Sequence, residues 1–561
     1  MFASVSATLI ACFQFSDSVI ARVRSIILRW KRGSHHAMEI LKLNLNKAPD
    51  LPTEKEIRFQ IALLAAVSAV VASFIARFVF GAPLVPELLA EMIFAHAPIW
   101  MVEIAVGFLG EFAKHLAFLG CTVLYLIALM ASTIGFLRYR AESGTSWIRR
   151  ASPAAFALLV WAITVTVLLP LLGAGFFGSH LRQGSLFTSI ALLLVHSAYG
   201  IAVAIATKQY LERPPKETSA SRIVSRRRFV RGIGYSVLIV GVYDIAVSLF
   251  GSWLQMGSGR VKKGDGVFPN INNLALEITP NQDFYKVSKN AFDPQVDARR
   301  WKLEIGGLVN APLSLSYEDI KAMTSVEQYA TLACISNEVG GDLIGNALWR
   351  GVRLKDLLTQ AGLKSGVVDI LLRADDGYTD SIPLERGLAE GTLLVYEMNS
   401  EPLTAEHGFP LRLLVPGIYG MKNVKWITRI EAVDFDFRGY WQRRGWDDRA
   451  EYKTMSRIDV PASSVKGEAT IAGIAFAGDR GVSRVEVSID GGKNWEPAEI
   501  KSPLSKFTWV LWHKAWSPEQ SGKHRIVVRA TDGQGVTQTS QLAPPAPSGS
   551  TGFHAVNVKS E

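Results

Sequence analysis

The chain has 561 residues, 49% of which are hydrophobic, and a net charge of +10 at pH 7. Long apolar runs occur only in residues 1–253, and the excess of basic residues lies in the same half, whereas residues 254–561 are close to neutral. The positive charge is therefore explained by membrane topology, which excludes nucleic acid as the expected partner. The length predicts several domains, with an α-helical membrane region first and a globular region after it.

Five segments are apolar enough to cross the hydrocarbon core of a bilayer, which takes about 20 residues. They are Phe59 to Phe80, His115 to Leu137, Pro153 to Phe177, Ser185 to Thr207 and Phe229 to Trp253. Residues 59–253 thus form the predicted membrane region, with the lipid bilayer as a partner. Residues 1–58 are assigned to a cytoplasmic N-terminal segment, and an interfacial helix is expected over Ala97 to Glu111.

The charges of the loops predict the orientation of these spans. The loops after the second and fourth spans are rich in arginine and lysine, whereas the loops after the first and third carry few basic residues. Since short basic loops stay in the cytoplasm, five spans place everything after Trp253 on the outer face of the membrane. In a bacterium this is the periplasmic face of the inner membrane.

A basic cluster stands directly before the fifth predicted span. Ser225 to Arg231 read Ser-Arg-Arg-Arg-Phe-Val-Arg, and this run resembles the twin-arginine export signal. That pathway carries folded proteins, often with a cofactor already inserted. An ordinary positively charged flank of a membrane span is the alternative interpretation.

The region after the spans divides into three parts. Residues 254–276 form a Gly-containing linker, and residues 277–460 alternate short β-like runs with short helical patterns, which predicts an α+β domain. Residues 461–541 contain strand after strand and predict a β-sandwich, and residues 542–561 are predicted to be a disordered tail. The clearest elements are strands at Trp301 to Ile305, Ile370 to Arg373, Leu393 to Tyr396, Arg412 to Val415, Ala469 to Phe476, Val482 to Ile489, Phe507 to Trp512 and His524 to Ala530, and helices at Tyr317 to Met323 and Leu354 to Ala361.

Cys334 is the only cysteine after residue 253. It ends a short apolar run and is followed by Ser, Asn and, after two more residues, a pair of glycines, so the backbone can turn just past the sulfur. A buried structural cysteine and a metal-ligating thiolate both fit this pattern.

The residues around Cys334 resemble the molybdenum-cysteine region of the sulfite oxidase family. Leu332 to Asn337 read Leu-Ala-Cys-Ile-Ser-Asn, followed by Trp349 to Leu358. Further segments resemble that family in the right order: the entrance strand (Asp283 to Asn290), the active-site tyrosine segment (Gly377 to Leu384), a strand and turn (Leu393 to Asn399), the pterin-binding loop (His407 to Arg412) and the Pro-Gly-x-x-Gly-x-x-x-Val-Lys-Trp run (Pro416 to Trp426). The resemblance extends over the predicted sandwich, for which it implies an immunoglobulin-like dimerisation domain and a homodimer.

The resemblance implies a molybdenum–molybdopterin cofactor and two-electron oxygen-atom transfer on a small substrate. Cys334 would be the metal ligand, because soft thiolates suit such a centre, and Tyr378 would direct its hydroxyl at the metal's equatorial oxygen or the substrate. Contacts to the cofactor are implied for Lys289, Asn290, Cys334, Asn337, Asp376, His407, Arg412, Asn423, Val424 and Lys425.

The chain also departs from this family. Glu338 stands in the post-cysteine segment, where sulfite-oxidising relatives have arginine, and the entrance strand offers Lys289. Sulfite is therefore one candidate substrate, and a neutral S-oxide, an N-oxide or a related small compound is another. A membrane receptor or scaffold that keeps the fold without the cofactor is the alternative from a different class.

Few residues are available for a second redox group. The chain has three cysteines and no Cys-x-x-Cys-His, so neither an iron–sulfur cluster nor covalent haem is expected. His115 and His196 lie at different predicted depths, so they do not form an evident pair of haem ligands. The expected electron partner is an external cytochrome or a quinone-linked protein.

Overall fold

The structure is a computed structural model that describes residues 53–98, 101, 112–142, 152–181, 183–211, 268–269, 271–290, 292–461, 463–518 and 520–561. The twin-arginine sequence and the fifth predicted span lie outside these residues. So do most of the predicted N-terminal segment, the interfacial helix and the linker.

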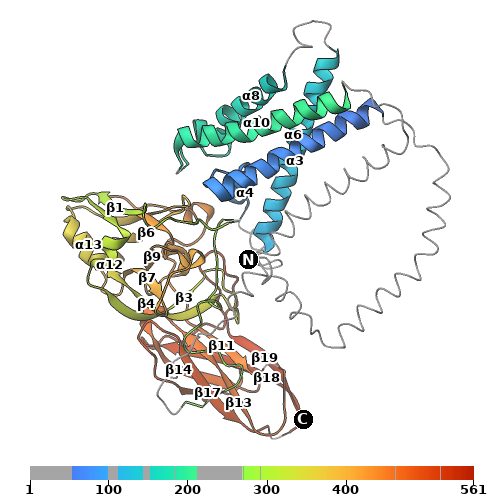
Figure 1. The fold of residues 1–561 in the computed structure, drawn as a ribbon. Helices are drawn as coiled ribbons and strands as arrows, with labels where there is room; N and C mark the ends of the chain where they lie inside the picture. The colour runs from blue at the N-terminus through green and yellow to red at the C-terminus, as the bar shows by residue number, and fades with distance from the viewer. Residues whose placement is uncertain are drawn as a thin grey trace, which may run out of the picture. The chain divides into compact units, whose positions relative to one another are not determined.

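The described N-terminal part is helical (Figure 1). Four stretches are long and apolar enough to cross a membrane, judged by length and composition: Glu54–Phe80, Lys114–Ala141, Pro153–Leu171 and Gly184–Tyr210. They coincide with the first four predicted spans. The elements are α3 (Glu54–Phe80), α4 (Val85–His96), α6 (Phe112–Glu142), α8 (Pro153–Ile163), the π-helical turn η1 (Thr164–Leu168), α9 (Leu169–Leu171), η2 (Phe176–Gly178) and α10 (Gly184–Tyr210).

Several polar groups in these helices find partners within the helical part. Tyr199 on α10 donates its hydroxyl hydrogen to the carbonyl of Leu129 on α6 over 2.7 Å. Arg77 near the end of α3 pairs with Glu87 on α4, with 3.1 Å between Nε and Oε2. Such pairing is required where no water can satisfy a polar group, which supports membrane association of this part.

Two sheets form the α+β region of the chain. The first has the order β2 (Leu313–Ser316), β1 (Lys302–Gly307), β10 (Ile427–Val433), β5 (Asp369–Ala374) and β6 (Thr379–Pro383). The second has the order β3 (Val326–Ala333), β4 (Ile344–Arg353), β7 (Leu393–Met398) and β8 (Glu401–Pro402), with β9 (Arg412–Leu414) paired to β7. The helices are α12 (Tyr317–Ala322), α13 (Leu354–Ala361) and α14 (Leu384–Gly387), and the single 3₁₀ turns are η3 (Ala405–His407), η4 (Gly420–Lys422) and η5 (Gln442–Arg444).

Local sequence explains where the two longer of these helices begin and end. Ser316 and Asp319 form a capping box at the start of α12, with each side chain accepting the other's backbone N–H. Gly362 ends α13 in the left-handed conformation at φ 69°, which glycine adopts without strain. Both helices were predicted from the sequence, and the bounds of α13 agree with the prediction.

Two further sheets close the chain and share one apolar core. One has the order β11 (Met455–Val460), β13 (Ala469–Phe476), β17 (Val510–Trp516) and β16 (Glu499–Ile500). The other has the order β12 (Ser464–Val465), β19 (His554–Ser560), β18 (Gly522–Asp532), β14 (Val482–Ser488) and β15 (Glu496–Pro497), and η6 (Gly478–Arg480) precedes β14. The predicted strand from Phe507 begins at Val510 instead, because Ser505 and Thr508 form a turn before it.

The prediction of a disordered tail over residues 542–561 is wrong. Residues 554–560 form β19, which pairs with β18 along seven residues, and Val558 is buried in the shared core. The alternation of Val556 and Val558 with polar residues is typical of a strand, but the preceding Pro/Ser/Gly-rich composition concealed it. This C-terminal segment also reaches the loop after Cys334, since the Ser550 hydroxyl donates to the carbonyl of Asn337 over 2.7 Å.

Candidate functional site

Cys334 lies directly after the buried end of β3 and is 8% exposed. Its backbone N–H donates to the carbonyl of Leu343, and its sulfur is 2.9 Å from the hydroxyl oxygen of Ser336. The side-chain carbonyl of Asn337 accepts the N–H of Leu343 over 2.9 Å and so closes the loop that leads back to β4. Burial raises the pKa of the Cys334 thiol, and the hydrogen bond from Ser336 opposes this rise.

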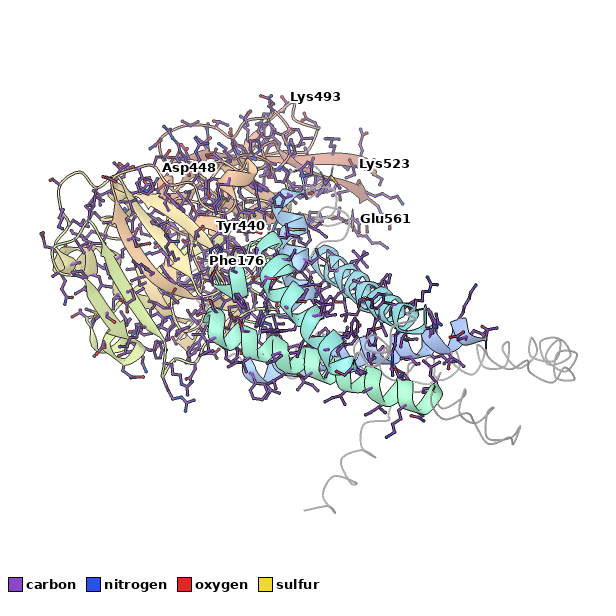
Figure 2. The ribbon with its side chains drawn as sticks, turned by 90° about the horizontal axis from the view of Figure 1, so that it is seen from above. Phe176, Tyr440, Asp448, Lys493, Lys523 and Glu561 are labelled. Atoms are coloured by element: carbon purple, nitrogen blue, oxygen red, sulfur yellow. The ribbon has the colours of Figure 1, made fainter. Side chains whose placement is uncertain are left out.

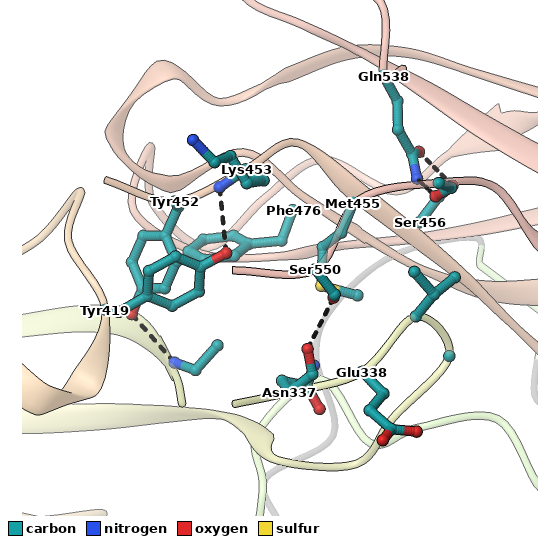
Figure 3. Close-up of a pocket in the computed structure, with 14 residues that line it drawn as sticks. Asn337, Glu338, Tyr419, Tyr452, Lys453, Met455, Ser456, Phe476, Gln538 and Ser550 are labelled. Atoms are coloured by element: carbon teal, nitrogen blue, oxygen red, sulfur yellow. Dashed lines mark hydrogen bonds between the residues drawn. The ribbon is translucent and has the colours of Figure 1, made fainter. Parts of the chain in front are cut away.

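Three tyrosines lie close to Cys334. The hydroxyl of Tyr452 accepts the N–H of Ala333 over 3.0 Å, and the rings of Tyr419 and Tyr452 are 4.6 Å apart (Figure 3). Tyr285 interacts electrostatically with both Cys334 and Arg412. Its hydroxyl crowds Gly420, where an added Cβ would lie 2.5 Å from the Tyr285 oxygen. No local pattern in the sequence distinguishes these tyrosines from ordinary core aromatic residues.

A small cavity of about 20 Å³ opens beside this loop. It is lined by Asn337, Glu338, Tyr419, Tyr452, Met455 and Gln538, among others. The volume suits a single water molecule and is too small for a substrate. Glu338 is exposed, and Figure 3 shows its carboxylate turned away from the two tyrosines. The acidic group that departs from the family pattern therefore faces solvent.

Three cationic residues predicted to bind the cofactor come together around β9. Arg412 donates to the carbonyls of His407 and Asn423 over 3.2 and 3.4 Å, Lys425 donates to the carbonyl of Glu406 over 2.9 Å, and His407 Nε2 lies 2.9 Å from the carbonyl oxygen of Asn281. These partners are all neutral. Among the described residues, no carboxylate forms an ion pair with any of the three cationic side chains.

Burial therefore weakens the charged forms of this basic cluster, which consists of His407, Arg412 and Lys425. Desolvation lowers the pKa of His407 to about 4, that of Arg412 to about 10 and that of Lys425 to about 8. The Nε of Arg412 is also buried without a hydrogen-bond partner in the described part of the chain. Arg412, buried with a spare N–H, and the half-buried Lys425 are cations without an ion pair among the described residues, and they fit an anionic ligand, such as a phosphorylated pterin.

Two other residues predicted to contact the cofactor, Asn423 and Val424, have side chains that are engaged within the protein. Asn423 is 1% exposed, accepts the N–H of Val415 over 2.6 Å and donates to the carbonyls of Ile418 and Tyr419. Val424 is 2% exposed and packs in the core of the first sheet. Their side chains shape the loop from Pro416 to Lys425, so any cofactor contact would come from their backbone.

Lys289, Asn290 and Asp376 form a second group of predicted site residues. Lys289 Nζ lies 2.8 Å from Asn290 Oδ1 and 3.7 Å from Asp376 Oδ2, and Asn290 Nδ2 donates to the same carboxylate oxygen over 2.9 Å. Burial alone would lower the pKa of Lys289, but the neighbouring carboxylates, Asp376 first, raise it above its usual value. The charge of Lys289 is thus already balanced by acidic groups.

Tyr378 follows this group in the chain, and its N–H donates to Asp376 Oδ1 over 2.9 Å. Its hydroxyl lies 2.9 Å from both Asp380 Oδ2 and the carbonyl of Met421. Asp380 and its partner Lys422 are 0% and 1% exposed. The sequence analysis missed both residues, although each falls within a segment quoted for the family resemblance. A charged residue inside an apolar motif was the available signal.

Comparisons with known proteins identify two domains in this part of the chain. The family model described as the oxidoreductase molybdopterin binding domain matches residues 290–441, and the Mo-co oxidoreductase dimerisation domain matches residues 452–546. The mitochondrial sulfite oxidase of Mus musculus is 34% identical over 320 residues, which cover 48% of this chain and 58% of that protein. The chain therefore spans little more than half the length of this relative.

Two further comparisons concern a bacterial protein and a solved structure. The oxidoreductase YuiH of Bacillus subtilis is 39% identical over 155 residues, covering 28% of this chain and 76% of that protein. The sulfane dehydrogenase SoxCD from Paracoccus pantotrophus superposes with a TM-score of 0.45 at 24% identity, covering 52% of this chain and 86% of that chain.

The buried thiol, the basic cluster and the two matched domains together define a molybdopterin-binding oxidoreductase region followed by a dimerisation domain. The chain belongs to the sulfite oxidase family of molybdopterin-dependent oxidoreductases.

Proposed function

We propose that this protein is a membrane-anchored molybdenum–pterin oxidoreductase that carries out two-electron oxygen-atom transfer on a small substrate outside the cytoplasm. The observation that carries the proposal is the buried Cys334 thiol together with a basic cluster whose side chains form no ion pair in the described part of the chain. When bound, the cofactor supplies the two-electron redox chemistry. The match to a dimerisation domain supports a homodimer.

The chain's own residues have separate roles in this proposal. Cys334 supplies the one protein thiolate to the metal, and Arg412 and Lys425 neutralise the anionic part of the pterin. His407 is held as a neutral ring at pH 7, because burial lowers its pKa to about 4, so it can hydrogen bond without adding charge. Tyr378 holds a proton beside the entrance group of Lys289, Asn290 and Asp376.

The entrance group favours a neutral oxide over sulfite as the substrate. A pocket for a dianion needs cations that are free to pair with it, but Lys289 is balanced by Asp376 and the post-cysteine segment contributes Glu338 rather than a cation. A neutral S-oxide or N-oxide needs no such free cation. Sulfite is the second candidate, supported by the mouse relative's name.

The location and the electron partner also belong to this proposal. The four apolar helices support a membrane anchor, and the predicted fifth span would place the catalytic region on the periplasmic side of a bacterial inner membrane. An external cytochrome or a quinone-linked protein would then exchange electrons with it.

The direct test uses the two buried free cysteines that the structure describes, Cys121 and Cys334. We expect the full-length protein in detergent to contain molybdenum in stoichiometric amount, Cys334→Ser to lose metal-dependent activity, and Cys121→Ser on α6 to keep both. Turnover is screened with sulfite, a sulfoxide and an N-oxide, using artificial electron donors and acceptors. A natively expressed, folded protein without molybdenum would support the scaffold alternative instead.

A further inference from the structure

A buried network of charged groups connects Tyr378 to the protein surface, and the proposed function leaves its role open. Asp380 on β6 is fully buried and receives the N–H of Ser381 and the Lys422 ammonium at Oδ1, over 2.8 and 3.1 Å. Its other oxygen, Oδ2, lies 2.9 Å from the Tyr378 hydroxyl and 3.3 Å from the Gln442 amide nitrogen. Asp380 is thus hydrogen bonded to both Tyr378 and Lys422.

Lys422 is shared between two carboxylates. Its three N–H groups point to Asp380 Oδ1, to the carbonyl of Ser381 over 2.8 Å and to Asp448 Oδ1 over 3.2 Å. Asp448 differs from Asp380 because its side chain is 41% exposed. Figure 2 labels Asp448 and Tyr440, which come from the same segment between β10 and β11. One ammonium therefore faces one buried and one solvated carboxylate, so the buried one can lose its charge without leaving Lys422 unpaired.

The hydrogen bonds of Tyr378 have two consistent arrangements. The hydroxyl carries one hydrogen but has two acceptors at 2.9 Å, Asp380 Oδ2 and the carbonyl of Met421. If Asp380 is ionised, the hydroxyl donates to it, and the carbonyl of Met421 is left without this bond. If Asp380 is protonated, it donates to the Tyr378 oxygen, and Tyr378 donates to Met421. The direction of the hydroxyl thus reports the protonation of Asp380.

We propose that Asp380 is the internal proton acceptor and donor for Tyr378, while Lys422, shared with Asp448, balances charge in both states. This inference rests on the proposed oxygen-atom transfer. In the oxidising direction, substrate and water yield oxygenated product, two protons and two electrons, and the electrons pass to the external electron carrier. One proton binds the Tyr378 oxygen as the existing Tyr378 O–H bond breaks and an O–H bond forms at Asp380 Oδ2, and the other proton passes to solvent water. The reducing direction runs the same transfer backwards.

The surroundings of Asp380 suit such an exchange. Burial raises the pKa of Asp380, although the Lys422 ammonium and the hydrogen bonds oppose this rise. Burial and the adjacent carboxylate also raise the pKa of Tyr378, which therefore stays protonated and transfers a proton only as it receives another. The titratable or charged groups that interact with Asp380 or its direct partners are Tyr378, Lys422, Asp448, Asp376, Asp369, Tyr440 and Arg444.

The first test does not depend on turnover. Infrared difference spectra are recorded across a pH titration of the full-length wild-type protein, Asp380→Asn and Tyr378→Phe. We expect a carboxylic acid band that titrates above the ordinary aspartate value of about 4, is absent from Asp380→Asn and shifts in frequency in Tyr378→Phe. Asp369→Asn is the matched control, because Asp369 is a second buried carboxyl with a raised pKa on the neighbouring strand and accepts a backbone N–H from Phe437. The band that Asp369→Asn leaves in place is the one assigned to Asp380, and its retention in Asp380→Asn overturns the proposal.

The second test uses the molybdenum-loaded enzyme with an accepted substrate. Asp380→Asn should lower kcat on the order of 10²-fold and remove one ionisation from the pH profile, with KM nearly unchanged. An unchanged profile in Asp380→Asn contradicts the role in proton exchange. If the wild-type enzyme turns over no substrate, the proposed function fails, and the infrared titration still decides whether Asp380 exchanges a proton with Tyr378.

Discussion

At the scale of single residues, Lys425 carries a charge that its surroundings do not neutralise. Burial, with a further contribution from Arg412, lowers the pKa of its ammonium to about 8, although the carboxylates of Asp293 and Asp376 oppose this shift. Its hydrogen-bond acceptor is the neutral carbonyl of Glu406. Such a residue destabilises the cofactor-free protein, and its charge is neutralised when an anion binds beside it. In the proposed function, the anionic cofactor would offset this cost to the stability of the empty fold.

This imbalance predicts how the stability of the cofactor-free protein depends on pH. The folded chain releases the Lys425 proton near pH 8, whereas the unfolded chain holds it up to about pH 10.4. Between these values the unfolded state binds more protons, so the free energy of unfolding should rise with pH. Lys425→Met should remove this rise and stabilise the cofactor-free protein at pH 7 by on the order of 1 kcal/mol.

The measurement is urea unfolding between pH 7 and pH 10, with Lys523→Met as the control. Lys523 is exposed on β18, and its replacement should leave the pH dependence intact. The cofactor-loaded protein should also lose the rise, since a bound anion holds the ammonium charged. Equal slopes in wild type and Lys425→Met would contradict this account of the basic cluster.

At the scale of elements, β19 shows how a short strand supports a distant loop. It pairs antiparallel with β18 and parallel with β12, and His554 Nδ1 at its start accepts the N–H of Ile458 over 3.0 Å. An added Cβ at Gly340 would lie 2.4 Å from the His554 ring, so β19 begins directly against the loop that follows Cys334. The end of the chain therefore helps to hold the loop after Cys334 in place.

Replacing Val558 tests whether β19 packs in the core between the two C-terminal sheets. It is 1% exposed in the core between the two C-terminal sheets, so Val558→Ala removes buried methyl groups and should lower the free energy of unfolding by about 2 kcal/mol. Asn557→Ala, the exposed neighbour on the same strand, should change it by less than about 0.5 kcal/mol. Thermal unfolding of the two variants makes the comparison, and equal effects would mean that β19 does not pack as described.

Elements of this chain differ in how well the sequence predicts them. The bounds of α13 were predictable because its apolar spacing and terminal Gly362 are local signals. The pairing of Lys422 with Asp380 was not, because 41 residues separate Lys422 from the carbonyl of Ser381 and only the sheet order brings η4 to β6. Cys334 and the basic cluster were found through family motifs, whereas Tyr285 carries no pattern that distinguishes it from core. Contacts between distant segments depend on the tertiary structure. They leave no local periodic pattern by which one sequence could predict them.

At the scale of the whole molecule, the number of spans decides which side of the membrane the catalytic region occupies. If all four apolar helices cross the membrane, the chain after them lies on the side on which it started, and the basic residues after α10 favour the cytoplasm for that side. A fifth span over residues 229–253, outside the described residues, would place the region after it on the opposite side of the membrane. The side of the membrane on which this region lies determines which electron partners and which substrates it can reach.

Two reporter fusions test the crossing, one after residue 214 and one after residue 253. We expect an alkaline phosphatase reporter, which is active only outside the cytoplasm, to be inactive at the first position and active at the second. Activity at neither position would place the catalytic region inside. Arg226→Lys/Arg227→Lys separates the two interpretations of the basic cluster before the fifth span, because it keeps the charge that topology requires and removes the twin arginines. Loss of export of the folded, molybdenum-loaded region with the spans still inserted indicates a twin-arginine signal, and unchanged export indicates a positively charged flank alone.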